Sequence, residues 1–222
     1  MNRTHSIIAS TIALSALGAG LAGFGFRSGA VEVSESTAVE LVENASIANV
    51  EYAVDPVHTS VLFKIRHGGV TNFYGRFNQV SGTIDFDKSD VTNSSMNFTI
   101  PVSSVDTNSK TRDGHIQDAE FFNARQYKDI SFESSSITQA SEGVYTLTGD
   151  LDFHGQTREI QATLAEVRTG SFRGRDVMGF EAVFSIKRSD FGIMKYVADD
   201  LSDNGPLGNT VEIIVAVEAG VK

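Results

Sequence analysis

The stretch "TSVLFKIRH", residues 59–67, decides the fold class of this chain. Val61, Phe63 and Ile65 recur at every second position, and Lys64 and Arg66 take the other face. Successive side chains of a β-strand point to opposite faces, so a period of two predicts a strand with one buried face. We therefore expect these three side chains to point inward, with His67 at the end of the same face.

The same alternation returns along the chain from Tyr52 onward, and it predicts about eight antiparallel strands. A one-residue shift of the apolar phase between Phe77 and Val80 predicts a β-bulge near residues 78–79. The dipeptide at 154–155, His-Gly, predicts a tight hairpin turn. The further inward faces are Met96, Phe98 and Ile100; Ile130 and Phe132; Tyr145, Leu147, Leu151 and Phe153; Ile160, Ala162 and Leu164; Met178, Phe180, Ala182, Phe184 and Ile186; and Val211, Ile213, Val215 and Val217.

Sequential antiparallel strands with one apolar face each must bury that face together. We expect an all-β fold, an eight-stranded antiparallel up-and-down barrel, with a short helical insertion at about 113–127 capped by Asp113 or Asp118. A barrel of about eight strands is either filled by its own side chains or holds one small ligand. The inward residues are nearly free of charge, so a hollow bore would accept an elongated apolar molecule, and the sequence leaves both alternatives open.

Composition excludes several classes of function. The chain of 222 residues is 41% hydrophobic, contains 15 Phe and no Trp, and carries a net charge of −10. Nucleic-acid binding is not expected, because it requires a basic surface. The absence of Cys excludes disulfides, thiolate catalysis and cysteine-ligated zinc.

The N-terminus, residues 1–30, is typical of an export signal peptide. Arg3 precedes an apolar run, and Ser28-Gly29-Ala30 fits a signal-peptidase site. We expect a periplasmic or secreted protein. The alternative is an uncleaved anchor that holds the protein on the inner membrane facing the periplasm, because residues 6–26 are uncharged and long enough to cross a bilayer.

Two segments follow the N-terminal 30 residues. Residues 31–50 are acidic, contain no turn signal and are interpreted as a tether, with a weak helix at 37–45. Residues 51–222 form the predicted barrel domain. One domain of this size is ordinary for a globular protein.

A polar segment, residues 111–134, places Arg112, Asp113 and His115 ahead of Phe121-Phe122. Acid, base and imidazole together suggest catalysis, but no nucleophile motif accompanies them. We therefore interpret the segment as a brace, in which Arg112 pairs with a carboxylate and the two Phe side chains fold against the mouth of the barrel.

No catalytic residue, metal site or cofactor is predicted. A metal hypothesis would recruit His58, His67, His115 and His154, but no pair has the spacing of helical metal ligands.

Two further segments have weaker interpretations. The loop with Arg168, Arg173 and Arg175 is interpreted as a solvated hairpin end, with attraction to an anionic membrane surface as the alternative. In "KRSDFGI" we expect Arg188 and Asp190 to close one end of the barrel.

The chain resembles the YceI-like family of polyisoprenoid-binding, lipocalin-like barrel proteins. The resemblance implies an eight-stranded barrel with a helical insertion, an export signal, and binding of a long isoprenoid or fatty-chain lipid without an established catalytic step. The sequence departs from the family pattern at Ile116, where Leu is usual, and at Lys128, where Pro is common. The matching pieces, in the family's order, are "YAVDPVHTSVLFKIRHGG" (52–69), "YGRFNQVSGTIDFD" (74–87), "VSSVDTNSKTRDGHIQDAEFFNARQYKDISFES" (102–134), "LTGDLDFHGQTREI" (147–160) and "FSIKRSDFGI" (184–193).

These observations predict extracytoplasmic binding, transport or storage of a long apolar lipid, whether a polyisoprenoid, an isoprenoid quinone or a fatty-chain amphiphile. The alternative is a non-catalytic structural or stress-related interaction module with a self-filled barrel. The resemblance also allows a homodimer. The expected ligand-binding residues are Phe63, Ile65, His67, Phe98, Ile100, Phe121, Phe122, Phe132, Leu147, Leu151, Met178, Phe180 and Phe184.

Overall fold

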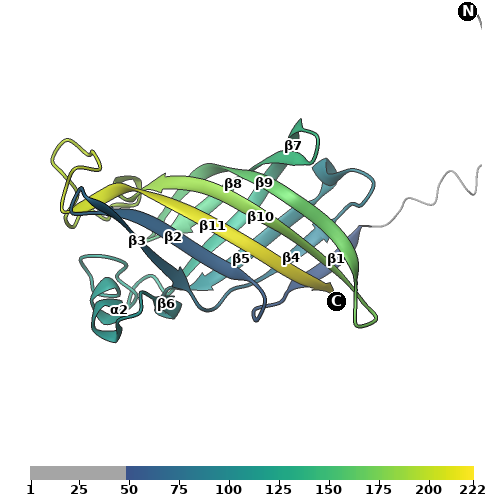
Figure 1. The fold of residues 1–222 in the computed structure, drawn as a ribbon, viewed down its shortest axis with the longest axis horizontal. Helices are drawn as coiled ribbons and strands as arrows, with labels where there is room; N and C mark the ends of the chain where they lie inside the picture. Colours follow the sequence, from purple (N-terminus) through teal and green to yellow (C-terminus); the bar gives the residue numbers. More distant parts are fainter. Residues whose placement is uncertain (1–48) are drawn as a thin grey trace, which may run out of the picture. The chain divides into compact units, whose positions relative to one another are not determined.

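Antiparallel hydrogen bonding joins all the strands of the described chain into one sheet (Figure 1). A computed structural model describes residues 49–222, so the predicted export signal or anchor and most of the tether lie outside the described residues. The strands are β1 (Val50–Val54), β2 (Ser60–His67), β3 (Thr71–Phe77), β4 (Ser81–Phe86), β5 (Ser95–Pro101), β6 (Val105–Asp106), β7 (Asp129–Ser141), β8 (Val144–Phe153), β9 (Gln156–Phe172), β10 (Arg175–Lys187) and β11 (Leu207–Val221). The short helices are η1 (Val91–Asn93), η2 (Val102–Ser104), α2 (Lys110–Ile116) and η3 (Arg188–Phe191).

Closure of the sheet produces the predicted barrel. The strands β1, β4, β5, β7, β8, β9, β10 and β11 form a closed ring of eight, because β1 pairs with both β4 and β11. At the other end, β2 takes over the pairing with β11, and β3 and β6 follow it. β6 has only two residues and pairs with β3 alone, so residues 107–128 occupy the place between β6 and β7. The eight-stranded antiparallel fold is confirmed.

The irregularity predicted near residues 78–79 is present as a break between two strands and not as a bulge. Eight residues lead from Ala53 in β1 to Val61 in β2, whereas six separate their partners, Thr83 in β4 and Phe77 in β3, and residues 78–80 belong to no strand. The predicted bulge is therefore an interruption between β3 and β4.

The hairpin turn at His154-Gly155 joins β8 to β9, with φ of 53° and 71° at its two residues. The Tyr127 ring packs against this turn, because its centroid lies 4.9 Å from that of His154. A Cβ at position 155 would lie 2.4 Å from the Tyr127 ring. Glycine is therefore required there both by the backbone and by the neighbouring ring.

The helical insertion differs from the prediction. Its helix, α2, begins three residues earlier than expected and ends at Ile116, and the chain continues in turns. The N-cap is Ser109, whose hydroxyl accepts a hydrogen bond from the Arg112 backbone at 3.5 Å. The predicted caps were wrong because the Asp113 carboxylate instead accepts hydrogen bonds from the backbone and hydroxyl of Thr107, at 2.8 and 2.5 Å. No helix of residues 49–222 has both the length and the apolar character to span a bilayer.

The strand β7 is longer than its sequence pattern predicted. The apolar alternation ends after Phe132, yet the strand continues through a polar stretch to Ser141. Pairing with β8 holds this extension, and Ile137 within it is buried. Pairing with β8 therefore extends β7 beyond the residues in which apolar and polar side chains alternate.

The barrel core contains several fully buried side chains at the β1 end. Tyr52, Ile84 and Ala219 are fully buried there, and Met96 and Met178 pack into the same cluster. A second cluster lies under the insertion and includes Phe121, Phe191 and Ile193. In Figure 1, α2 lies at the end of the barrel where β3 and β6 are found, and β1 and the C-terminus lie at the opposite end.

The buried hydroxyl of Tyr52 allows a test of this packing. It has no hydrogen-bond partner among the described residues, although the ring packs edge-on against Phe86 at 6.4 Å. A buried hydroxyl without a partner costs about 1–3 kcal/mol. We expect Tyr52→Phe to raise the free energy of unfolding by about 1 kcal/mol and Tyr52→Ala to lower it by about 3–5 kcal/mol in urea titrations. A loss of stability in Tyr52→Phe would contradict this account.

Candidate ligand-binding cavity

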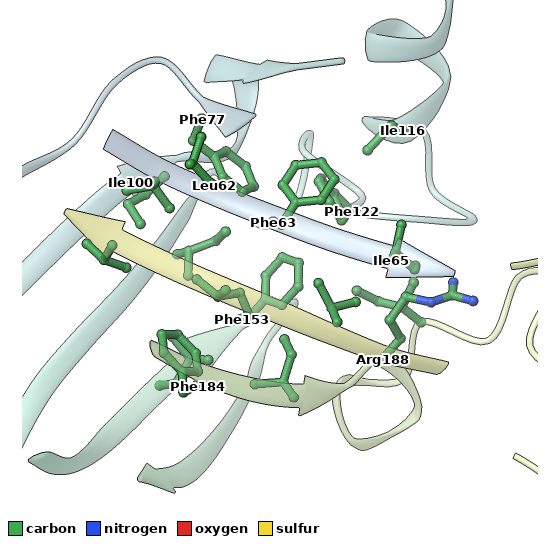
Figure 2. A pocket seen from close by; sticks show the side chains of 18 of the residues that line it. Leu62, Phe63, Ile65, Phe77, Ile100, Ile116, Phe122, Phe153, Phe184 and Arg188 are labelled. Carbon is green, nitrogen blue, oxygen red and sulfur yellow. The ribbon is translucent and has the colours of Figure 1, made fainter. Parts of the chain in front are cut away.

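The barrel encloses a cavity of about 580 Å³ in the half nearer the insertion (Figure 2). This volume lies within the range of ordinary ligand pockets, about 300–1,000 Å³. Side chains from β2, β3, β5, β7, β8, β9, β10, β11, the insertion and the segment between β10 and β11 line it, and most of them are apolar. Of the thirteen expected ligand-binding residues, twelve line this cavity.

Met178 is the exception, and its place explains where the cavity ends. Its side chain is only 2% exposed and belongs to the packed cluster with Tyr52, Ile84 and Leu164 at the β1 end. The interior of the barrel is therefore not hollow along its whole length. The barrel is filled at one end and hollow at the other, which combines the two alternatives that the sequence left open.

Glycine residues in the wall help to keep the bore hollow. Phe63 of β2 pairs with Gly75 of β3, and the Phe63 ring lies so close that a Cβ at position 75 would be 2.2 Å from it. The ring therefore lies against the neighbouring strand, where a side chain at position 75 would push it toward the bore. Rings also lie beside two other wall glycines, Phe98 beside Gly82 and Phe132 beside Gly149, although a Cβ at either position would come closest to a backbone carbonyl oxygen.

The insertion contributes Phe122 to the wall of the cavity. Its ring stacks on Phe77 at 6.1 Å and meets Phe153 edge-on at 5.2 Å. The backbone of Val102 also donates a hydrogen bond to the Lys128 carbonyl at 2.8 Å, which ties the end of the insertion to η2, directly after β5. The prediction that Phe121 and Phe122 fold against the barrel is confirmed.

A second contact joins the insertion to the loop between η3 and β11. The Phe121 ring lies 6.1 Å from Tyr196, and Glu120 forms a salt bridge of 2.7 Å with Lys195. The hydrogen bond from Lys195 lowers the pKa of Glu120, and the same bond raises the pKa of Lys195. Because Phe121 and Tyr196 both line the cavity, these contacts form part of its rim.

The cluster Arg112, Asp113 and His115 is a brace, but not of the expected kind. Arg112 donates hydrogen bonds to the hydroxyl and carbonyl of Thr107, and its guanidinium lies 4.6 Å from the Phe73 ring centroid. The predicted pairing of Arg112 with a carboxylate was wrong: no such pair forms among the described residues, and Thr107 takes that place. The His115 ring packs edge-on against Phe121 at 5.1 Å.

Arg188, expected only to close one end of the barrel, is a functional candidate that was absent from the expected ligand-binding residues. It lines the cavity, yet only 5% of it is exposed. Its guanidinium donates to the carbonyls of Gly208, Lys195 and Leu207 at 2.8, 3.0 and 3.1 Å, and burial lowers its pKa to about 10. The alternation of β10 could have indicated this, because Arg188 lies two residues after Ile186 and so continues the inward-facing series of Phe184 and Ile186.

Several other sequence hypotheses concern residues outside the cavity. Asp190 is exposed, so of the two residues expected to close this end only Arg188 is buried. The arginine loop is the β9–β10 hairpin, where Arg173 lies 5.2 Å from the Phe172 ring. Attraction of this hairpin to a membrane surface stays a prediction.

Within residues 49–222, one cluster has the geometry of metal ligands: Asp55, His58 and Glu218, whose ligand atoms lie within 4.8 Å of one another. The Asp55 carboxylate accepts a hydrogen bond of 2.9 Å from Nδ1 of His58, and this bond raises the pKa of His58. None of the three residues lines the cavity. The other histidines of the metal hypothesis lie apart: His67 and His115 at the cavity rim, and His154 against the Phe191 carbonyl.

Comparison with known proteins gives consistent matches. Residues 52–219 match the family model of the YceI-like domain. A UPF0312 protein of Ectopseudomonas mendocina is 35% identical over 171 residues, which cover 76% of this chain and 86% of that protein. BcnA of Burkholderia cenocepacia has a similar fold, with a TM-score of 0.64, 24% identity, and coverage of 74% of this chain and 98% of BcnA. A polyisoprenoid binding domain from Saccharophagus degradans has a TM-score of 0.59 at 15% identity, over 78% of this chain and 99% of that domain.

The contact between Phe63 and Gly75 generates a test of the cavity. We expect Gly75→Ala to push the Phe63 ring into the bore, because ring atoms are what a Cβ there would meet. Loss of space for about two methylenes, at ~0.8 kcal/mol each, should weaken binding of an aliphatic fluorescent probe roughly tenfold. The control is Gly170→Ala on β9, where a Cβ meets nothing within 4 Å. Equal probe affinity in the two variants would count against this role of Gly75.

Proposed function

The chain belongs to the YceI-like family, and from that premise we propose that it binds a long single-chain apolar lipid inside the barrel. The observation that carries the proposal is the cavity of about 580 Å³, closed at one end by the packed core and lined almost entirely by apolar side chains. A water molecule takes up ~30 Å³ in the liquid. If a methylene group needs the same volume, the cavity holds a chain of roughly twenty carbons.

The energetics of burial favour such a ligand. Transfer of ten methylenes from water into the cavity contributes about 8 kcal/mol, and association and ordering take back several kcal/mol of this. A short chain would therefore bind weakly, whereas a chain of twenty carbons can bind tightly through apolar contacts alone. The Saccharophagus degradans domain of the same fold is a polyisoprenoid binding domain, which supports an isoprenoid chain as one form of this ligand.

We further propose that the protein carries or stores its lipid outside the cytoplasm, and that it acts as a binding protein and not as an enzyme. The location rests on residues 1–30, which combine an early positive charge, an apolar run and a small-residue cleavage site. The alternative within this proposal is an uncleaved anchor that holds the barrel at the inner membrane, facing the periplasm.

Native mass spectrometry of gently purified protein tests the binding proposal. We expect an apolar adduct on the wild-type protein and its loss in Phe63→Asp, because a carboxylate in the lining would lose its hydration when the chain enters. The matched control is Phe172→Asp, which makes the same change at a side chain that is 55% exposed and does not line the cavity.

Phe172→Asp should keep the adduct. An unchanged lipid content in Phe63→Asp, or a wild-type protein that takes up no lipid even after incubation with lipid vesicles, would contradict the proposal. The second result would favour the structural module that the sequence analysis held as the alternative.

A further inference from the structure

The charged side chains around the cavity all have the same sign. The protein carries a net charge of −10, with 28 acidic residues against 18 Lys and Arg. Yet no Asp or Glu lines the cavity, whereas two Arg and two His do. In an acidic protein this distribution produces a local environment that attracts anions. The basic and imidazole residues of the lining are His67, Arg112, His115 and Arg188.

Arg188 differs from the other three because it is buried. His67, Arg112 and His115 are exposed at the rim, whereas Arg188 is 5% exposed. Its three hydrogen bonds all go to main-chain carbonyls, and among residues 49–222 no carboxylate lies within 4 Å of it. The acid that acts on it electrostatically is Asp203, which does not line the cavity.

The hydrogen bonds of Arg188 pair its charge with no carboxylate and leave part of its donor capacity free. A guanidinium has five N–H groups, and the three bonds to carbonyls leave two of them available. A buried charge is costly unless it is paired, and attraction between opposite charges is stronger in a low dielectric than in water. An anionic oxygen at this position would therefore gain a charge-assisted hydrogen bond in apolar surroundings.

The position of Arg188 suits the head of an amphiphile. Figure 2 shows Arg188 at one end of the cavity, with its nitrogen atoms on the side away from Phe184. The packed core with Met178 closes the opposite, β1 end of the barrel. A chain that enters tail first would therefore leave its head near Arg188 and the exposed basic residues of the rim.

We propose that the cavity selects amphiphiles with a singly charged anionic oxygen headgroup, of which a long-chain carboxylate is the simplest, and that Arg188 receives this headgroup. This inference rests on the proposed lipid-binding function and deepens it. One buried guanidinium matches one negative charge, so a monoanion is neutralised without leaving a second charge desolvated. Neutral chains of the same length still bind, but less tightly.

Binding of three ligands with the same chain, oleate, oleyl alcohol and methyl oleate, to the delipidated protein tests the proposal. At pH 8 we expect the wild-type protein to bind oleate at least about tenfold more tightly than either neutral analogue, which is the equivalent of one hydrogen bond to a charged group. Equal affinity for all three overturns this inference alone. Failure of all three to bind overturns the proposed lipid-binding function as well.

Two substitutions at position 188 distinguish the effect of its positive charge from the effect of its hydrogen bonds to the three carbonyls. Arg188→Lys and Arg188→Met both break the contacts with the three carbonyls, but only Arg188→Met removes the charge. We expect Arg188→Lys to keep most of the preference for oleate and Arg188→Met to lose it while still binding oleyl alcohol. An equal loss of preference in both variants overturns the role of the charge and leaves Arg188 as a structural clamp.

A variant at the rim keeps the test decisive if neither substitution at position 188 folds. Arg112→Met removes the other arginine of the lining, which is exposed. Persistence of the oleate preference in Arg112→Met supports Arg188 as the cation that receives the headgroup. Loss of the preference in Arg112→Met overturns that assignment and moves the headgroup site to the rim.

Discussion

Burial of one apolar face along a long antiparallel sheet is the constraint on which the rest of this structure depends. Eight strands satisfy it by closing into a ring, in which β1 bridges β4 and β11. A ring of this size is near the limit that side chains can fill. Tyr52, Ile84 and Met178 fill it at one end, whereas glycine-backed rings such as Phe63 leave space at the other.

The cavity is tied to an interruption in the barrel wall. Because β6 has two residues and pairs with β3 alone, the insertion replaces the missing pairing with β7. Phe122 from this insertion stacks on Phe77 and closes the wall with an apolar ring. Glu120 then connects the same segment to Lys195 across the rim. The part of the wall held by side chains and not by strand pairing is thus the part that borders the mouth.

Charge enters this apolar interior at one buried position. Arg188 follows the end of β10 and ties together the backbone of the loop that leads into β11. The same three contacts hold its guanidinium in place next to the cavity. One side chain therefore has both a structural role and the proposed binding role. Fixed donors in a low-dielectric site interact with an anion more strongly than mobile donors in water, and this is the physical basis of the headgroup proposal.

The sequence by itself determined the barrel, the break in alternation near residues 78–79, the turn at His154-Gly155 and twelve of the cavity residues, because the period of two is a local property of strand geometry. Only the tertiary structure decided which inward residue meets space and which meets a neighbour. Met178 faces inward as predicted but packs against the core. Likewise, Asp113 failed as a cap because Thr107 binds its carboxylate. Both outcomes depend on which residues the fold brings next to these side chains. The alternation of apolar and polar residues along the chain does not contain that information.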